Sequence, residues 1–182
     1  MPSAQGNPAS IVIAGIGVAA GRGYGKQALR AALFGEAPTF GPLRRDGRQL
    51  PDGTSSFIGL ELPDPPELLP ARIARTAGLP GRAAIAVLDE AWRESRLDDL
   101  DPARIGLVVG GSNLMAREQM LAQRNYAGRM AYWPPRHGHM FLDTDIAGLC
   151  ASAFPIRGFT MSVGGASASG AVAVRMCSCP QT

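Results

Sequence analysis

A run of small residues near the end of the sequence has the composition of a turn that displays a nucleophile. Between the apolar stretches FTMSV and AVAVRM stands Gly-Gly-Ala-Ser-Ala-Ser-Gly, with Ser167 at its centre. A serine on a tight strand-to-helix turn has an exposed side chain, and its backbone N–H, at the helix start, points towards any oxyanion formed nearby. Ser167 is therefore the candidate nucleophile. The candidate turn and oxyanion residues are Gly164, Gly165, Ala166, Ala168, Ser169 and Gly170.

Residue types alone leave a structural explanation equally open, because small side chains also let two backbones pack in contact. A comparison with the G-x-S-x-G elbow of α/β-hydrolases gives only a partial match, Gly165-x-Ser167-x-Ser169. That elbow also needs an acid and a histidine after the serine, and this sequence ends fifteen residues later. We therefore set the hydrolase interpretation aside.

Three other patterns could suggest a metal or nucleotide site, but each is better explained without a ligand. His137 and His139 alternate in RHGH, but the flanking prolines and glycine predict a loop and no further ligand completes a metal site. Cys177 and Cys179 lack a second ligand pair at zinc spacing. The glycines of GIGVAAG miss the dinucleotide fingerprint G-x-G-x-x-G by one residue, so a nucleotide site is a minor alternative.

The composition predicts one globular domain in the cytoplasm. The 182 residues are 46% hydrophobic and 18% charged, which is enough for a core. No apolar run is long enough to cross a membrane, and MPSAQGNPAS does not resemble a secretion signal. The formal charge of +3 comes from scattered arginines, with one cluster at Arg44, Arg45 and Arg48. We interpret that cluster as a solvated loop and expect no nucleic acid partner.

The elements that must position Ser167 alternate between strand and helix. We expect a buried strand over 11–18, a helix from Lys26 to Gly35, a helix over 81–95, and a strand over 105–109. A helix that Asp143-Thr144-Asp145 can cap, the strand 159–163 and a helix from Gly170 follow. Residues 36–70 and 114–140 are expected to be loop-rich excursions, with a short strand possible in 56–62 and helical character in REQMLAQRNYAGRM. This alternation predicts an α/β layered domain.

The ordered segments resemble the β-ketoacyl synthases of the thiolase superfamily. IVIAGIGVAAG is similar to their first strand and turn, AAIAVLDEAWRES to a helix, and RIGLVVGGSN to a strand that ends in glycines. Residues 165–170 align without a gap on the nucleophile turn T-A-C-A-S-G of that family. The resemblance implies a thiolase-like αβαβα fold of two similar halves, of which residues 1–182 form the N-terminal half.

One departure concerns the nucleophile, because Ser167 stands where the family has cysteine. A serine hydroxyl is a poor substitute for a thiolate in acyl transfer. VGGASASG and DTDIAGLCASAFPIRG are similar to the ketosynthase-like decarboxylases of polyketide β-branching cassettes. The resemblance implies decarboxylation of malonyl-acyl carrier protein to acetyl-acyl carrier protein. It also implies no cofactor of the protein's own, since phosphopantetheine of the carrier protein holds the substrate.

A second departure is length, because the resemblance places the family's two catalytic histidines in a C-terminal half that nothing in these 182 residues matches. His137 and His139 precede Ser167 and do not correspond to them. The pattern breaks down at RMCSCPQT, so we expect a truncated chain. The alternative is a non-catalytic fragment or an interaction half. By resemblance, the partners would be an acyl carrier protein, a second copy in a homodimer paired through 159–163, and a hydroxymethylglutaryl-synthase-like enzyme.

Overall fold

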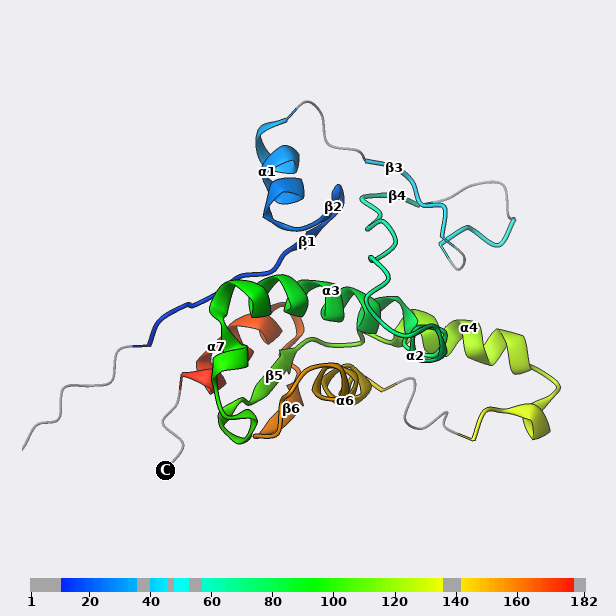
Figure 1. The fold of residues 1–182 in the computed structure, drawn as a ribbon. Coiled ribbons are helices and arrows are strands. Elements are labelled where there is room, and N and C mark those ends of the chain that lie inside the picture. The colour runs from blue at the N-terminus through cyan, green and yellow to red at the C-terminus, as the bar shows by residue number, and fades with distance from the viewer. Residues whose placement is uncertain (1–10, 36–39, 46–47, 53–56, 136–141, 179–182) are drawn as a thin grey trace, which may run out of the picture.

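The computed structural model describes residues 11–35, 40–45, 48–52, 57–135 and 142–178 (Figure 1). Its centre is a parallel pair of strands, β5 and β6, whose register places Gly110 opposite Val163. The helices and strands are β1 (Ala19–Ala20), β2 (Gly23–Tyr24), α1 (Lys26–Phe34), β3 (Gly41–Pro42), β4 (Ile58–Gly59), α2 (Ala71–Ala74), α3 (Gly78–Ser95), β5 (Leu107–Gly110), α4 (Ala116–Tyr126), α6 (Thr144–Ala153), β6 (Thr160–Val163) and α7 (Ser169–Cys177). Short 3₁₀ turns cover Leu97–Asp99, Pro102–Arg104, Met130–Tyr132 and Ala166–Ala168.

Helices cover both faces of β5. Leu107 and Val109 pack against the core cluster formed by Ile85 of α3 and Ile146 of α6, together with Met115 and Cys150. Successive side chains of a strand point to opposite faces, so Gly110 faces away from this cluster, and it lies against α7. The order of layers is therefore α3 and α6, then the strands, then α7 (Figure 1).

A second core cluster packs against the C-terminal end of α3. Trp92 is buried against Ile105 and Ile156, and its ring lies 5.1 Å from that of Phe154. The indole N–H donates to Asp98 Oδ1 at 2.7 Å. A buried indole needs such an acceptor, so the polar turn after α3 completes the packing of its last apolar residue.

Most of the predicted elements are confirmed. The helix over 81–95 is α3, extended at its start, and the strand over 105–109 is β5, shifted by one or two residues. The strand at 159–163 is β6, the helix from Lys26 to Gly35 is α1, and a helix follows the turn as α7. Within the range 56–62, where a short strand is expected, Ile58 and Gly59 form β4. The expected helical stretch after residue 114 is α4.

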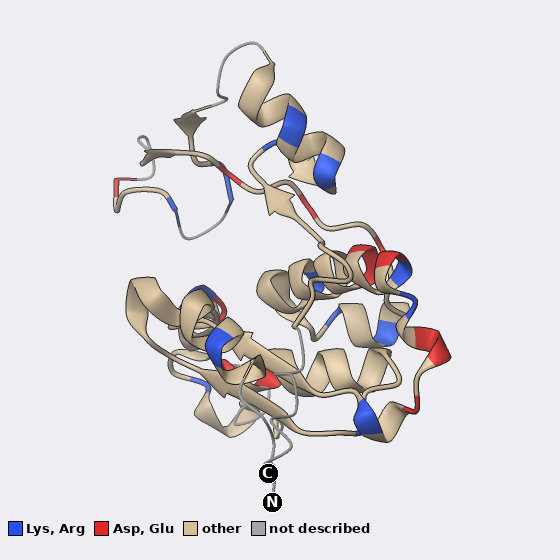
Figure 2. Ribbon diagram, turned by 90° about the vertical axis from the view of Figure 1, so that its left-hand side faces the viewer, with Lys and Arg blue, Asp and Glu red and all other residues tan. Residues whose placement is uncertain are grey.

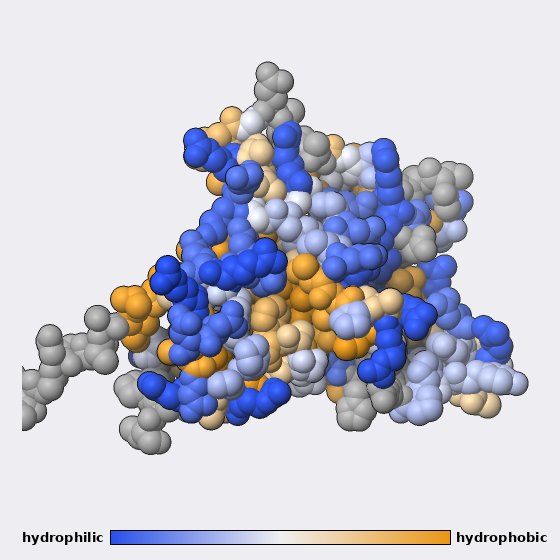
Figure 3. Space-filling view, in the orientation of Figure 1, coloured by the Kyte–Doolittle hydropathy of each residue, from blue (hydrophilic) through white to orange (hydrophobic). Residues whose placement is uncertain are grey.

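The buried strand predicted over 11–18 is wrong. No strand of the described chain lies beside it, and Ile11, Val12 and Ile13 are 70%, 76% and 81% exposed. The segment runs along α3, where Glu94 and Glu90 accept the N–H groups of Ile16 and Val18. Carboxylates take the place of a neighbouring strand as acceptors for these two N–H groups, while the apolar side chains of residues 11–13 face outwards. Figure 3 shows this apolar surface next to the grey N-terminal residues.

Candidate active site

The carboxyl ends of β5 and β6 bring two distant turns together. Because the strands are parallel, the residues that follow Gly110 lie beside those that follow Val163, and Gly111 N–H donates to Val163 O at 3.0 Å. Ser112, at the end of the first turn, therefore reaches Gly164, whose Cα would carry a Cβ only 3.2 Å from Ser112 Oγ. The candidate nucleophile turn rests on this junction.

Ser167 is displayed at the surface of a strand–turn–helix unit. β6 ends at Val163, a 3₁₀ turn covers Ala166–Ala168, and α7 begins at Ser169. Ser167 is exposed, whereas Ser169 is buried with 5% of its surface accessible. The exposure that the sequence predicts for residue 167 is thus present in the fold.

The backbone donors of the turn have different partners. Gly165 N–H donates to Ser169 Oγ at 2.9 Å and Ala168 N–H donates to Gly165 O at 2.9 Å. Ala166 N–H donates to Ser112 Oγ at 3.3 Å. Within the described chain, the Ser167 N–H has no protein acceptor. A free amide at the start of a helix is the kind of donor that stabilises a developing oxyanion.

The small residues also serve close packing. A Cβ on Gly110 would lie 2.4 Å from Ser169 O and 2.8 Å from the Cβ of Ala173, so α7 can approach β5 only at a glycine. A Cβ on Gly165 would lie 3.3 Å from Val172 Cγ2, which is closer than an ordinary van der Waals contact. A Cβ on Gly170 would meet no described atom within 4 Å. Close packing is therefore seen at Gly110 and Gly165, while the display of Ser167 as a nucleophile stays a prediction.

Asp143 differs from its predicted role as a helix cap. It precedes α6, but its carboxylate makes no hydrogen bond to that helix. Instead, Asp143 Oδ1 accepts from Met115 N–H at 3.1 Å, and Asp143 O accepts from Ser162 Oγ at 3.2 Å. The residue links the turn after β5 to β6, a role that requires long-range contacts and leaves no local signal in the sequence. An open groove of about 350 Å³ adjoins it, lined by Asn113, Ala116, Gln119, Leu142, Asp143 and Thr144.

A carboxylate of the protein binds the N-terminus of α1, where a phosphate-binding loop would leave the backbone N–H groups free for a ligand. Glu90 Oε1 accepts from Lys26 N–H and Glu90 Oε2 from Val18 N–H, both at 2.9 Å. Beside it, a contact with Lys26 Nζ at 2.5 Å and the Ile16 N–H hold the pKa of Glu94 below its usual value. These negative charges occupy the position at which a phosphate would bind to a helix N-terminus, which argues against the nucleotide interpretation.

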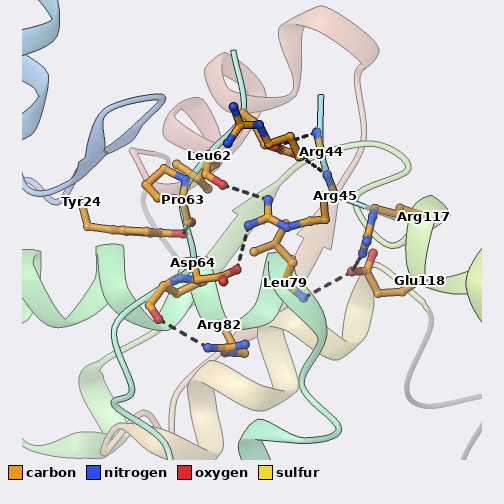
Figure 4. Close-up of polar contacts among 12 residues, drawn as sticks. Tyr24, Arg44, Arg45, Leu62, Pro63, Asp64, Leu79, Arg82, Arg117 and Glu118 are labelled. Atoms are coloured by element: carbon orange, nitrogen blue, oxygen red, sulfur yellow. Dashed lines mark hydrogen bonds and ion pairs between the residues drawn. The ribbon is translucent and has the colours of Figure 1, made fainter. Parts of the chain in front are cut away.

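The arginine cluster is only partly a solvated loop. Arg45 is half-buried, and its guanidinium donates to Leu62 O at 2.8 Å and to Asp64 Oδ1 at 2.7 Å (Figure 4). Nearby, Arg117 pairs with Glu118, whose Oε1 also accepts from Leu79 N–H (Figure 4). Figure 2 shows basic and acidic segments interspersed along the chain. Arg45 thus links the excursion after β3 to the segment that follows β4, at Leu62 and Asp64, which the sequence did not indicate.

Two further sequence patterns can be placed. His137 and His139 lie outside the described residues, as does Cys179, while Cys177 is exposed. Among the described residues, no cluster of three or more histidine, cysteine or acidic side chains is arranged to hold a metal ion. In the same part of the chain, no helix has both the length and the apolar character needed to cross a membrane.

Comparison with known proteins assigns the chain to a family. Residues 9–178 match the model of the beta-ketoacyl synthase N-terminal domain. The chain belongs to the beta-ketoacyl synthase family. It is 41% identical over 170 residues to the polyketide biosynthesis malonyl-ACP decarboxylase PksF of Bacillus subtilis (strain 168), an alignment that covers 92% of this chain and 40% of PksF. The chain therefore spans less than half the length of that relative.

Solved ketosynthases share the fold. The ishigamide ketosynthase/chain length factor superposes with a TM-score of 0.65 at 20% identity, covering 84% of this chain and 39% of the other. A beta-ketoacyl synthase from Burkholderia phymatum STM815 gives 0.63 at 19% identity, covering 91% and 41%. These superpositions confirm the thiolase-like layered fold and place the chain on about two fifths of it.

Sequence reasoning missed Ser112 and Glu90 as well as the linking role of Asp143. The sequence does contain a pattern that could have identified Ser112, because this residue follows an apolar strand and two glycines, Gly110 and Gly111. A polar residue at that place in a parallel sheet lies at the edge where sites form. Glu90 lies on α3, and only the path of residues 11–18 reveals what its carboxylate binds.

Proposed function

We propose that this chain is the N-terminal part of a ketosynthase-like protein of polyketide biosynthesis that decarboxylates malonyl-acyl carrier protein to acetyl-acyl carrier protein. The observation that carries the proposal is a serine at the nucleophile position in a chain 41% identical to a malonyl-ACP decarboxylase. Serine in place of cysteine disfavours acyl loading, because the hydroxyl is rarely ionised. Decarboxylation does not require that acyl transfer.

In the proposed reaction, the bond between the malonyl carboxylate and the α-carbon breaks and CO₂ leaves. The bonding electrons form the enolate of an acetyl thioester, with negative charge on the thioester oxygen, and a proton then adds to the α-carbon. The Ser167 N–H, which has no acceptor within the described chain, is the donor we assign to that oxygen. The exposure of the turn supports access by a long phosphopantetheine arm.

The partners belong to the same proposal. The acyl carrier protein would deliver the substrate, and a hydroxymethylglutaryl-synthase-like enzyme would use the acetyl product. A homodimer would pair the strand 159–163, in which Phe159 is 52% exposed. We expect no cofactor beyond the carrier's phosphopantetheine and a cytoplasmic location.

The test is a mass measurement on malonyl-acyl carrier protein. We would assay the chain alone and the chain continued by the part of PksF that follows the matched segment, with PksF as the positive control. Loss of one CO₂ from the carrier in the continued protein is the expected result. An unchanged carrier, in a continued protein that elutes as a folded species, would contradict the decarboxylase proposal.

A second candidate is a non-catalytic interaction half. It is favoured by the three exposed apolar side chains Ile11, Val12 and Ile13, which a soluble surface rarely groups together. This candidate predicts that the chain binds the remaining part of PksF as a separate polypeptide and that the complex leaves malonyl carrier unchanged. Turnover by the chain alone would exclude it.

A further inference from the structure

Two serine hydroxyls from separate turns hold the backbone of the nucleophile turn. Ser169 Oγ donates to Ala166 O at 2.7 Å and accepts from Gly165 N–H at 2.9 Å. Ser112 Oγ accepts from Ala166 N–H at 3.3 Å and lies 3.2 Å from Ser169 Oγ. Ser169 is buried, so the bonds that its hydroxyl makes are partly sheltered from water, whereas the bond from Ala166 N–H to Ser112 Oγ is exposed.

The number of available protons determines which of the two hydroxyls donates to the other. A serine has one proton to donate, and that of Ser169 is committed to Ala166 O. Ser112 must therefore donate to Ser169. The result is a closed ring that runs from Ala166 N–H to Ser112, from Ser112 to Ser169, and from Ser169 back to Ala166 O.

The ring encloses the one residue of the turn with an unfavourable backbone. Ala166 has a φ of 48°, in the left-handed region that residues with a side chain seldom adopt. Both of its polar backbone groups are bonded to the ring, so the ring can hold a conformation that alanine alone would leave. The same bonds occupy the N–H groups of Gly165 and Ala166 and leave that of Ser167 for a ligand.

We propose that Ser112 and Ser169 are positioning residues that lock Ala166 in the left-handed conformation and thereby aim the Ser167 N–H and side chain at the substrate. The reaction that they would serve rests on the proposed function. The geometry of the turn does not, and it can be measured without any substrate.

The test uses Ser167→Cys in the full chain as a reporter of the turn. A thiol beside the start of a helix is ionised more readily and is alkylated faster by iodoacetamide. Trypsin cleaves after Arg157 and Arg175, so residue 167 lies in a different peptide from Cys177 and from Cys150. Exposed Cys177 is the internal reference, and buried Cys150 reports unfolding when it reacts.

Adding Ser112→Ala or Ser169→Ala should slow alkylation at position 167 by at least about threefold relative to Cys177, which corresponds to half a unit in the thiol pKa. Adding Ala166→Gly to Ser169→Ala should restore most of the rate, because glycine adopts positive φ without the ring. The matched control is Ser152→Ala, which removes a hydroxyl bonded only to its own helix, at Leu149 O, and should change nothing at position 167.

An unchanged ratio in both Ser112→Ala and Ser169→Ala would overturn the proposal, as would a glycine at 166 that fails to restore the rate. If Ser169→Ala lets Cys150 react, that variant has unfolded, and the Ser112→Ala result alone decides the test. Ser112 is exposed, so its truncation leaves the core intact. A chain that passes this test but leaves malonyl carrier unchanged would contradict the proposed function and not the positioning ring.

Discussion

A Cβ atom on Gly110 would lie 2.4 Å from the carbonyl oxygen of Ser169, so the end of β5 and the start of α7 are in backbone contact. This contact sets the distance between the first turn and the nucleophile turn, and it determines whether Ser112 can reach Ala166. The junction therefore couples the packing of the sheet to the geometry of the candidate site.

Gly110→Ala should destabilise the protein because neither neighbouring backbone can yield without moving α7. Overpacking of this kind costs about 1–3 kcal/mol of unfolding free energy, measurable as a lower urea midpoint. The matched control is Gly170→Ala, whose Cβ meets no described atom and which removes a glycine from a helix. The control should raise stability by up to about 1 kcal/mol. Equal effects of the two substitutions would contradict the packing that we describe.

Glu90→Gln should loosen the N-terminal segment. The carboxylate accepts from Val18 and Lys26, and hydrogen bonds to a charged acceptor contribute about 1.5–3 kcal/mol. Hydrogen exchange of these two amides should accelerate, while amides in β5 keep their protection. Glu67→Gln, at an exposed position, is the control and should leave both amides unchanged. Unaltered exchange in Glu90→Gln would show that the carboxylate does not anchor the segment.

Cys150 should make stability fall at high pH. Burial raises the pKa of its thiol from 9.0 to about 11. Between these values the unfolded chain loses the thiol proton and the folded chain keeps it, so unfolding is favoured as pH rises. The loss is on the order of 1.4 kcal/mol per pH unit across that window. Urea unfolding from pH 8 to 11 should show a shallower decline in Cys150→Ala, and parallel curves would contradict this assignment.

Ser167→Cys should convert the site from acyl-inert to acyl-accepting in the protein continued by the remaining part of PksF. A thiolate attacks a thioester far more readily than a serine hydroxyl does. Intact mass after incubation with an acyl thioester should show an adduct on the cysteine form and none on the native protein. Ser167→Ala is the control, and because it retains the backbone N–H it should still decarboxylate malonyl carrier. A cysteine form that stays unlabelled would contradict the nucleophile assignment at residue 167.

The sequence by itself determined the elements whose signals are local. The apolar spacing of Ile85, Leu88 and Trp92 specified α3, and short apolar runs bounded by glycines specified β5 and β6. The turn around Ser167 was found because a helix start with glycines and small residues has a recognisable composition. Each of these patterns depends on neighbours within one or two turns of chain.

Only the tertiary structure decided the contacts made between distant segments. Residues 11–18 have the composition of a buried strand, yet a strand exists only where another strand accepts its hydrogen bonds, and here Glu90 and Glu94 take that place. Ser112 and Ser169 are 57 residues apart, and their meeting depends on the parallel register of β5 and β6. Pairing register and the path of a loop arise from the whole fold, which is why the residue types indicated the candidate nucleophile turn but not the two hydroxyls that bond to it.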